Sequence, residues 1–121
     1  MGHTFSSLDE LGDGVFRKIR PALGITAFGA NALVLPPGAQ SRPHSHDKQD
    51  ELYFVHRGRA EVRLPGERRE LGPGGLVHVE STTPRVLKNI GDEELVLVVV
   101  GGSGGYVGRD GRPADPDELG Y

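Results

Sequence analysis

Two histidines and one acidic residue stand close together near the middle of the chain. His44 and His46 are separated by one serine, and Glu51 follows five residues after His46. On an extended segment, alternate side chains point to the same face, so both imidazoles would lie on one face. This is how metal ligands are spaced. The chain contains no cysteine, which leaves histidines and carboxylates as the donors for a metal ion.

The composition indicates how many domains the chain forms and which kinds of partner it is expected to bind. A length of 121 residues suits one small domain. The net charge is -3, and the basic residues are scattered among the acidic ones, which argues against a nucleic acid or an anionic membrane as partner. The longest apolar run, at 95–100, is too short to span a membrane, and the first residues do not read as a secretory signal. We therefore expect a cytoplasmic protein, and the excess of arginine over lysine favours a bacterial source.

Short strand-like runs, separated by turns rich in glycine and proline, dominate the chain. Several alternate apolar and polar residues, and they lie at 25–35, 51–56, 60–64, 76–79, 85–89 and 94–100. Helix is nearly absent, apart from one short turn at 6–11 that Ser6 or Ser7 would cap. Many short strands at such spacing predict an all-β sandwich or barrel.

The chain divides into three parts. We expect an N-terminal segment over 1–13, one barrel domain over 14–102, and a C-terminal segment over 103–121 that is dense in glycine, proline and aspartate. This composition predicts a loosely held tail, unless Tyr106 or Val107 docks on the barrel.

The residues around the two histidines form a longer pattern. Gly38, His44, His46, Glu51 and Gly58 resemble the first signature motif of the cupin superfamily, with every fixed position filled. The resemblance covers roughly residues 30–100. It implies a single-domain antiparallel jelly-roll β-barrel in which the two histidines and the glutamate face inward and bind a divalent metal ion, namely Fe, Mn, Ni or Zn.

The alternation of side-chain direction along a strand, here called strand parity, extends this prediction to the barrel interior. With Glu51 inward, Tyr53 and Val55 follow it inside, whereas His56 would face outward. The residues that we expect to fill the interior around the polar site are Val55, Val62, Leu64, Val77, Val79 and Leu87. Gly58 stands between two predicted strands, where a tight hairpin needs a positive φ.

The second motif of the family is incomplete in this chain. When the sequence is aligned on Gly74 and Asn89, Arg85 occupies the position of the third histidine ligand. His78 is not expected to replace it, because it alternates with two inward valines and should point away from the barrel axis.

Arg85 changes what the site is expected to do. A guanidinium cannot ligate a metal ion, and a dication repels it by roughly 4 kcal/mol per unit of metal charge at about 4 Å and an effective dielectric near 20. Two arrangements relieve this repulsion. Either no metal is present and Arg85 pairs with Glu51, or the metal is present and Arg85 turns toward an anionic ligand that bridges both positive centres.

Two classes of function remain open. In the first, His44, His46 and Glu51 hold a metal ion for a dioxygenase or isomerase reaction on a carboxylate or enol-type molecule, and Arg85 and Tyr53 contact the substrate. In the second, the chain is a metal-free cupin that binds a small acid or sugar without catalysis, or acts as an isomerase, with an ion pair between Arg85 and Glu51. The barrel alone does not decide between them.

We also expect a homodimer. Small cupins commonly dimerise, and an open jelly roll leaves sheet edges and outer apolar faces that a second copy would cover. The outward apolar residues predicted for this contact are Leu52, Phe54 and Phe28.

Overall fold

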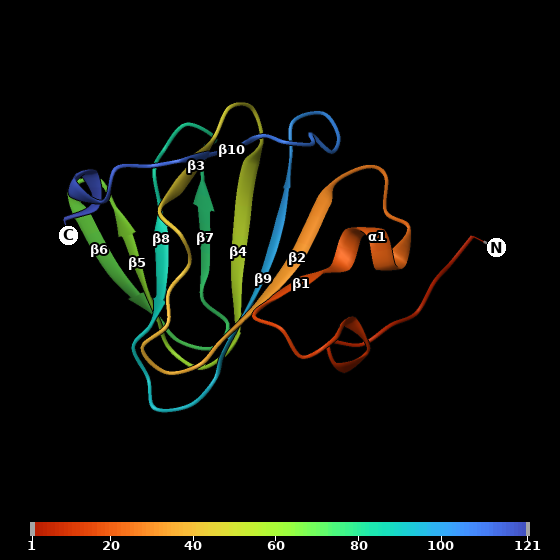
Figure 1. Cartoon of the computed structure of the whole chain (residues 1–121), viewed down its shortest axis with the longest axis horizontal. Helices are drawn as coiled ribbons and strands as arrows, with labels where there is room; N and C mark the ends of the chain where they lie inside the picture. Colours follow the sequence, from red (N-terminus) through yellow and green to blue (C-terminus); the bar gives the residue numbers. More distant parts are fainter. Residues whose placement is uncertain (1, 121) are drawn as a thin grey trace.

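The computed structural model describes residues 2–120, and most of its regular structure consists of short β-strands (Figure 1). The strands are β1 (Phe16–Lys18), β2 (Gly29–Leu35), β3 (His44–His46), β4 (Asp50–Arg57), β5 (Ala60–Leu64), β6 (Glu67–Leu71), β7 (Leu76–Val79), β8 (Val86–Asn89), β9 (Leu95–Gly102) and β10 (Gly111–Pro113). The helical segments are the 3-10 turn η1 (Asp9–Leu11), the helix α1 (Ile19–Leu23) and the 3-10 turn η2 (Pro116–Leu119). Within residues 2–120, no helix is long and apolar enough to cross a membrane.

The strands form antiparallel sheets. The larger sheet has the order β1-β2-β9-β4-β7, the smaller one has the order β6-β5-β8, and β3 pairs with β10. In Figure 1, the strands of the two main sheets run roughly between the bottom and the top of the view, and β3 and β10 lie together at the top. The antiparallel jelly-roll barrel predicted from the sequence is confirmed.

The hydrophobic core lies between the two main sheets. One continuous cluster of buried side chains includes Val55, Leu97 and Val99 of the larger sheet and Val62 and Leu87 of the smaller one. The interior predicted from strand parity is confirmed. Four of its members are fully buried, and Leu64 and Val77 pack against the cluster while partly exposed.

Each of the six predicted strand-like runs corresponds to a strand, whereas several polar strands were missed. β6 has the sequence ERREL and its side chains are mostly exposed, so it lacks the apolar alternation that marks a strand. Helix α1 was missed because it is only five residues long and contains Pro21. It ends at Leu23 and is capped by Gly24, whose φ is 69°. The predicted N-terminal turn is present as η1, and Ser7 Oγ accepts a hydrogen bond from the Glu10 N–H at 3.3 Å.

Gly58 has the conformation that the sequence predicted. Its φ is 86°, and a Cβ at this position would lie 2.8 Å from the Glu94 carbonyl oxygen. Both the backbone angle and the close approach therefore require glycine here.

The C-terminal segment packs on the barrel. Tyr106 stacks with Arg20, whose Cζ lies 3.8 Å from the centre of the ring. β10 then pairs with β3, and Leu119 is buried. The docking of Tyr106, which the sequence left as the alternative to a loose tail, is therefore present in the structure.

Candidate metal centre

Strands β3 and β4 bring the three predicted ligand residues together. β3 is held by two backbone hydrogen bonds between His44 and Arg85, of 2.9 and 3.2 Å. Glu51 is the second residue of β4, and β4 lies between β7 and β9 in the larger sheet. One possible ligand atom from each of His44, His46 and Glu51 lies within 4.8 Å of the other two. The spacing of these residues in the sequence thus predicted their meeting in space.

His44 presents Nε2 to the site. Its Nδ1 lies 2.8 Å from the carbonyl oxygen of Arg42, which only accepts, so Nδ1 carries the proton and donates it. In the neutral imidazole, Nε2 is therefore left with its lone pair, 3.8 Å from Glu51 Oε1. This is the tautomer that binds a metal ion through Nε2.

His46 has two buried ring nitrogens without a hydrogen-bond partner among residues 2–120. Nε2 lies 3.2 Å from Glu51 Oε2, and Nδ1 lies 3.5 Å from Oδ2 of Asp110. Its side chain is only 10% exposed. Buried polar atoms usually have a partner, so an unpaired imidazole that faces a carboxylate and a second histidine fits a ligand-binding role.

Glu51 is buried and shares its two oxygens between different partners. Oε1 accepts hydrogen bonds from the Tyr53 hydroxyl at 2.5 Å and from Arg85 Nη1 at 2.8 Å, while Oε2 faces His46. Burial disfavours the charged form, but the contacts with His44, His46 and Tyr53 outweigh it and hold the pKa of Glu51 well below its ordinary range. The carboxylate therefore stays ionised.

Two neighbours support this carboxylate. Tyr53 is buried, and burial together with the charge of Glu51 raises the pKa of its hydroxyl well above the ordinary value, so the hydroxyl remains a donor. Gly101 lies opposite Glu51 in β9, where a Cβ would lie 3.1 Å from Glu51 Cγ and 2.8 Å from the Asp50 carbonyl oxygen. The absence of a side chain at Gly101 makes room for the glutamate.

Arg85 is fully buried beside Glu51. Besides the bond to Glu51, Nε donates to the Thr83 carbonyl at 3.0 Å, and Nη2 donates to the carbonyls of Glu80 and Ser81 at 2.8 and 3.3 Å. The guanidinium thus joins Glu51 to the loop before β8. Of the two arrangements expected for Arg85, its pairing with Glu51 is the one that the structure contains.

The other histidines lie away from this group. His78 is exposed on β7, with Nε2 3.8 Å from Asp50 Oδ2, and His56 is exposed on β4. Both positions agree with the outward parity expected from the sequence.

An open cavity of about 580 Å³ adjoins the three ligand residues. His44, His46, Glu51 and Tyr53 line it together with apolar residues of β2 and β9. Two arginines, Arg42 and Arg112, also line it, whereas Arg85 is not among the lining residues.

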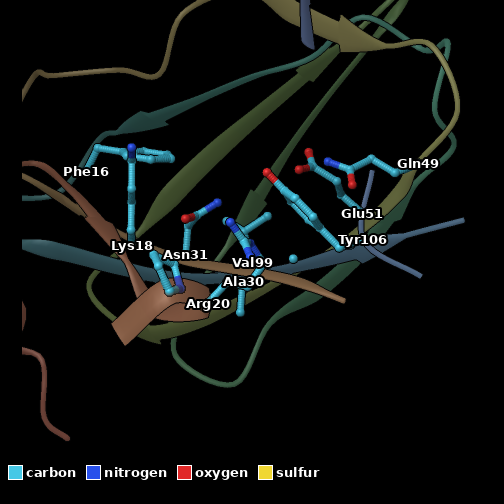
Figure 2. A pocket seen from close by; sticks show the side chains of 12 residues that line it. Phe16, Lys18, Arg20, Ala30, Asn31, Gln49, Glu51, Val99 and Tyr106 are labelled. Atoms are coloured by element: carbon cyan, nitrogen blue, oxygen red, sulfur yellow. The ribbon is translucent and has the colours of Figure 1, made fainter. Parts of the chain in front are cut away.

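A smaller cavity of about 160 Å³ shares Gln49 and Glu51 with the first. Figure 2 shows Gln49 and Glu51 at one end of it and Lys18 at the other. Sequence reasoning missed Gln49, whose side-chain oxygen is buried without a partner among residues 2–120, and it missed Asp110 and Arg112. Gln49 stands inside the first motif, which was a usable signal, whereas the residues after 102 carried no signal that placed them at the site.

The chain belongs to the cupin family. The family model described as the cupin domain matches residues 32–101, which include the three ligand residues, Tyr53 and Arg85. The match ends before the C-terminal segment that closes on β3.

Known proteins support the same assignment. An uncharacterised protein of Methanocaldococcus jannaschii is 29% identical over 75 residues, which are 62% of this chain and 59% of that protein. The pectin degradation protein KdgF of Dickeya dadantii is 39% identical over 69 residues, which are 54% of this chain and 58% of that protein. The chain thus spans nearly three-fifths of the length of these curated relatives. A cupin protein of Bacteroides fragilis has a similar solved structure, with a TM-score of 0.74, 19% identity, and coverage of 85% of this chain and 86% of that chain.

Proposed function

We propose that the chain binds a divalent metal ion through His44 Nε2, His46 Nε2 and Glu51, next to a cavity for a small anionic molecule. The observation that carries this proposal is the imidazole of His46, whose two buried nitrogens have no hydrogen-bond partner among residues 2–120. The proton position on His44 agrees with it, because a metal ion binds the free Nε2 of a neutral imidazole.

The donor set fits the metals that the sequence predicted. Two histidines and one carboxylate form the facial ligand set of Fe(II) oxygenases, and the same donors accept Mn, Ni or Zn. Such a metal, when bound, supplies a Lewis acid with positions left open for a small molecule or dioxygen. A dioxygenase or isomerase reaction is therefore the enzymatic function that we propose for the site.

Arg85 and Tyr53 were both expected to contact the substrate. Tyr53 lines the larger cavity, and we retain it as a ligand contact. Arg85 is buried behind Glu51, so we propose that it acts on the ligand through Glu51, by offsetting the charge of that carboxylate. The cation that reaches an anionic ligand directly is then Arg42, which lines the same cavity. Arg112 also lines this cavity, but its guanidinium is paired with Asp47 and donates to the carbonyls of Arg109 and Gly111.

A second candidate function is a metal-free cupin that binds a small acid or sugar. The ion pair between Arg85 and Glu51, at 2.8 Å, supports this candidate. The pair balances the buried charge of Glu51 without a metal ion, as the first of the two arrangements considered for Arg85 requires. His46 would then be the residue without an evident role, which is why we rank this candidate second.

The ligand class and the assembly are also proposals. The name of the Dickeya dadantii relative refers to the breakdown of pectin, a polysaccharide, so small carbohydrate-derived acids are the first compounds to test.

We propose a homodimer through the outer face of the larger sheet, where Leu52, Phe54 and Leu76 are exposed. Cytoplasmic location and bacterial origin stay predictions from the sequence.

Metal titration of two histidine variants tests the proposed function. Calorimetry with Mn²⁺, Ni²⁺ and Zn²⁺ should show one site in the tag-free parent, and His46→Ala should lose it. His78→Ala removes an exposed histidine from the outer face and should bind the metal as the parent does. Equal binding by the parent and His46→Ala would contradict the proposed site. Absence of binding in the parent would leave the metal-free binder as the function.

A further inference from the structure

We propose that Asp110, which lies beyond the part of the chain that matches the cupin family, is a positioning residue for the metal ligand His46. The inference rests on the proposed metal site, because it concerns the imidazole that would bind the ion. It assigns a role to the C-terminal segment, which neither the sequence motifs nor the family match includes.

The carboxylate of Asp110 is buried against the turn that joins β3 to β4, where it accepts backbone hydrogen bonds. Its two oxygens accept the Lys48 N–H at 3.1 Å each, and Oδ2 also accepts the Gln49 N–H at 2.8 Å. Asp110 is 5% exposed. These backbone N–H donors stabilise the ionised form of the carboxylate. A negative charge therefore stands next to the turn that links His46 to Glu51.

The same carboxylate faces the outer nitrogen of His46. The distance from Oδ2 to Nδ1 is 3.5 Å, longer than a well-formed hydrogen bond but close enough for the charge to favour a proton on Nδ1. With the proton on Nδ1, Nε2 presents its lone pair to Glu51 and His44. Carboxylates behind metal-binding histidines commonly fix the tautomer and ring orientation in this way.

The backbone of the C-terminal segment delivers Asp110 to this position. The Asp110 carbonyl accepts the Asp47 N–H at 3.0 Å, and β10 then pairs with β3, with Gly111 opposite His46. Arg109 has a φ of 54°, which is uncommon for a residue other than glycine and sets the turn before Asp110. In Figure 1, the C-terminal segment crosses the top of the barrel beside β3.

The two ligand histidines would thus present Nε2 to the site by different means. His44 is fixed by the Arg42 carbonyl within its own segment, whereas His46 depends on a carboxylate 64 positions further along the chain. Loss of the Asp110 charge should therefore affect His46 and leave His44 unchanged.

Asp110→Asn tests the inference, with Asp47→Asn as the matched control. Asn keeps the shape of the side chain but removes the charge. Asp47 lies at the same junction of β3 and β10 and pairs with Arg112 at 2.5 Å, so its replacement perturbs the junction while the Asp110 carboxylate keeps its charge. The first readout is the ring-nitrogen NMR spectrum of His46 in the metal-stripped protein, which reports the tautomer. The second is the dissociation constant for Zn²⁺.

We expect the parent and Asp47→Asn to carry the His46 proton on Nδ1 and to bind Zn²⁺ equally. Asp110→Asn should shift the proton toward Nε2 and weaken Zn²⁺ binding by about 10-fold to 100-fold. An unchanged His46 tautomer in Asp110→Asn would overturn the inference. A changed tautomer in a protein whose parent holds none of Fe, Mn, Ni and Zn would support the positioning role and refute the proposed metal function, so the two failures are distinguishable.

Asp110→Glu separates positioning from a purely structural role. It keeps the negative charge, so the positioning role predicts that the His46 proton returns to Nδ1 and that part of the Zn²⁺ affinity is restored. If the bonds to Lys48 and Gln49 were the whole role, the Asn and Glu variants would show the same tautomer and the same affinity. That result would overturn the inference. If Asp110→Asn is too unstable to purify, Asp110→Glu is compared with the parent alone, and a His46 proton on Nε2 in Asp110→Glu would overturn the inference.

Discussion

Arg85 donates a hydrogen bond from Nη1 to Glu51 Oε1 over 2.8 Å, and both side chains are almost completely removed from solvent. The pair occupies the part of the barrel where the family resemblance would place a third histidine ligand. Oε1 of the carboxylate is thereby engaged, and Oε2 remains directed at His46. The site thus retains a donor set of two histidines and one carboxylate oxygen, with a fixed positive charge behind it.

Replacement of Arg85 by histidine should have opposite effects on metal affinity and on stability. Arg85→His removes a cation near the ion and adds a neutral donor, so metal affinity should rise. The same change breaks a buried ion pair and leaves the carbonyls of the loop at 80–83 without donors, so the metal-stripped protein should lose about 3–5 kcal/mol of unfolding free energy. Titration calorimetry and urea unfolding measure the two effects.

Arg69→His is the control for this change. Arg69 is exposed on β6, so the substitution adds a histidine and removes a charge away from the cavity. It should alter neither metal affinity nor stability appreciably. Equal metal affinities in the parent and Arg85→His would mean that Arg85 does not influence the site.

The hydroxyl of Tyr53 should stabilise the charged form of Glu51. Tyr53→Phe removes a buried hydrogen bond to a carboxylate, which costs about 1.5–3 kcal/mol of unfolding free energy. Tyr106→Phe makes the same change at an exposed tyrosine and keeps the ring against Arg20. The free energy of unfolding should change by close to zero in this variant. Chemical denaturation of both variants decides the point, since equal stability losses would refute the role of the Tyr53 bond.

The stability of the metal-stripped protein should fall in acid. Because the pKa of Glu51 is lowered in the folded state, the unfolded chain binds more protons at low pH. The contribution of Glu51 to the free energy of unfolding is fully present above pH 4.5, the ordinary pKa of a glutamate. It is lost progressively as the pH falls below that value. Urea unfolding between pH 7 and pH 3 should therefore show that the stability difference between the parent and Glu51→Gln shrinks with acid. A difference that stays constant with pH would contradict the lowered pKa.

The outer face of the larger sheet should mediate dimer formation. Leu76 lies opposite Phe54 in the pairing of β7 with β4, and both are exposed. Light scattering at tens of micromolar should give twice the monomer mass of 13.0 kDa, and Leu76→Asp should give the monomer mass. A parent protein that scatters as a monomer would refute the dimer.

The fold was predictable because its central strands follow simple alternation. In β4, buried and exposed residues alternate from Glu51 to Val55, so one correctly oriented residue fixed the direction of its neighbours. β3, β6 and β10 were not predictable by this rule, since their side chains are polar or exposed along the strand.

The site was predictable only in part. His44, His46 and Glu51 stand close together in sequence, and their spacing sufficed to place them. Asp110 reaches His46 through the pairing of β10 with β3, and no local pattern indicates a contact between residues so far apart. The partners of Arg85 were also undetermined, because the sequence allowed the guanidinium to face either Glu51 or the cavity.

The metal content of the protein tests the central claim most directly. The protein should be purified without an affinity tag, and its Fe, Mn, Ni and Zn should be measured by elemental analysis before and after dialysis against each metal ion. We predict one metal ion per chain in the parent protein and none in the double variant His44→Ala with His46→Ala. A parent protein that holds no metal after dialysis against all four ions, while it remains folded, would contradict the proposed metal centre.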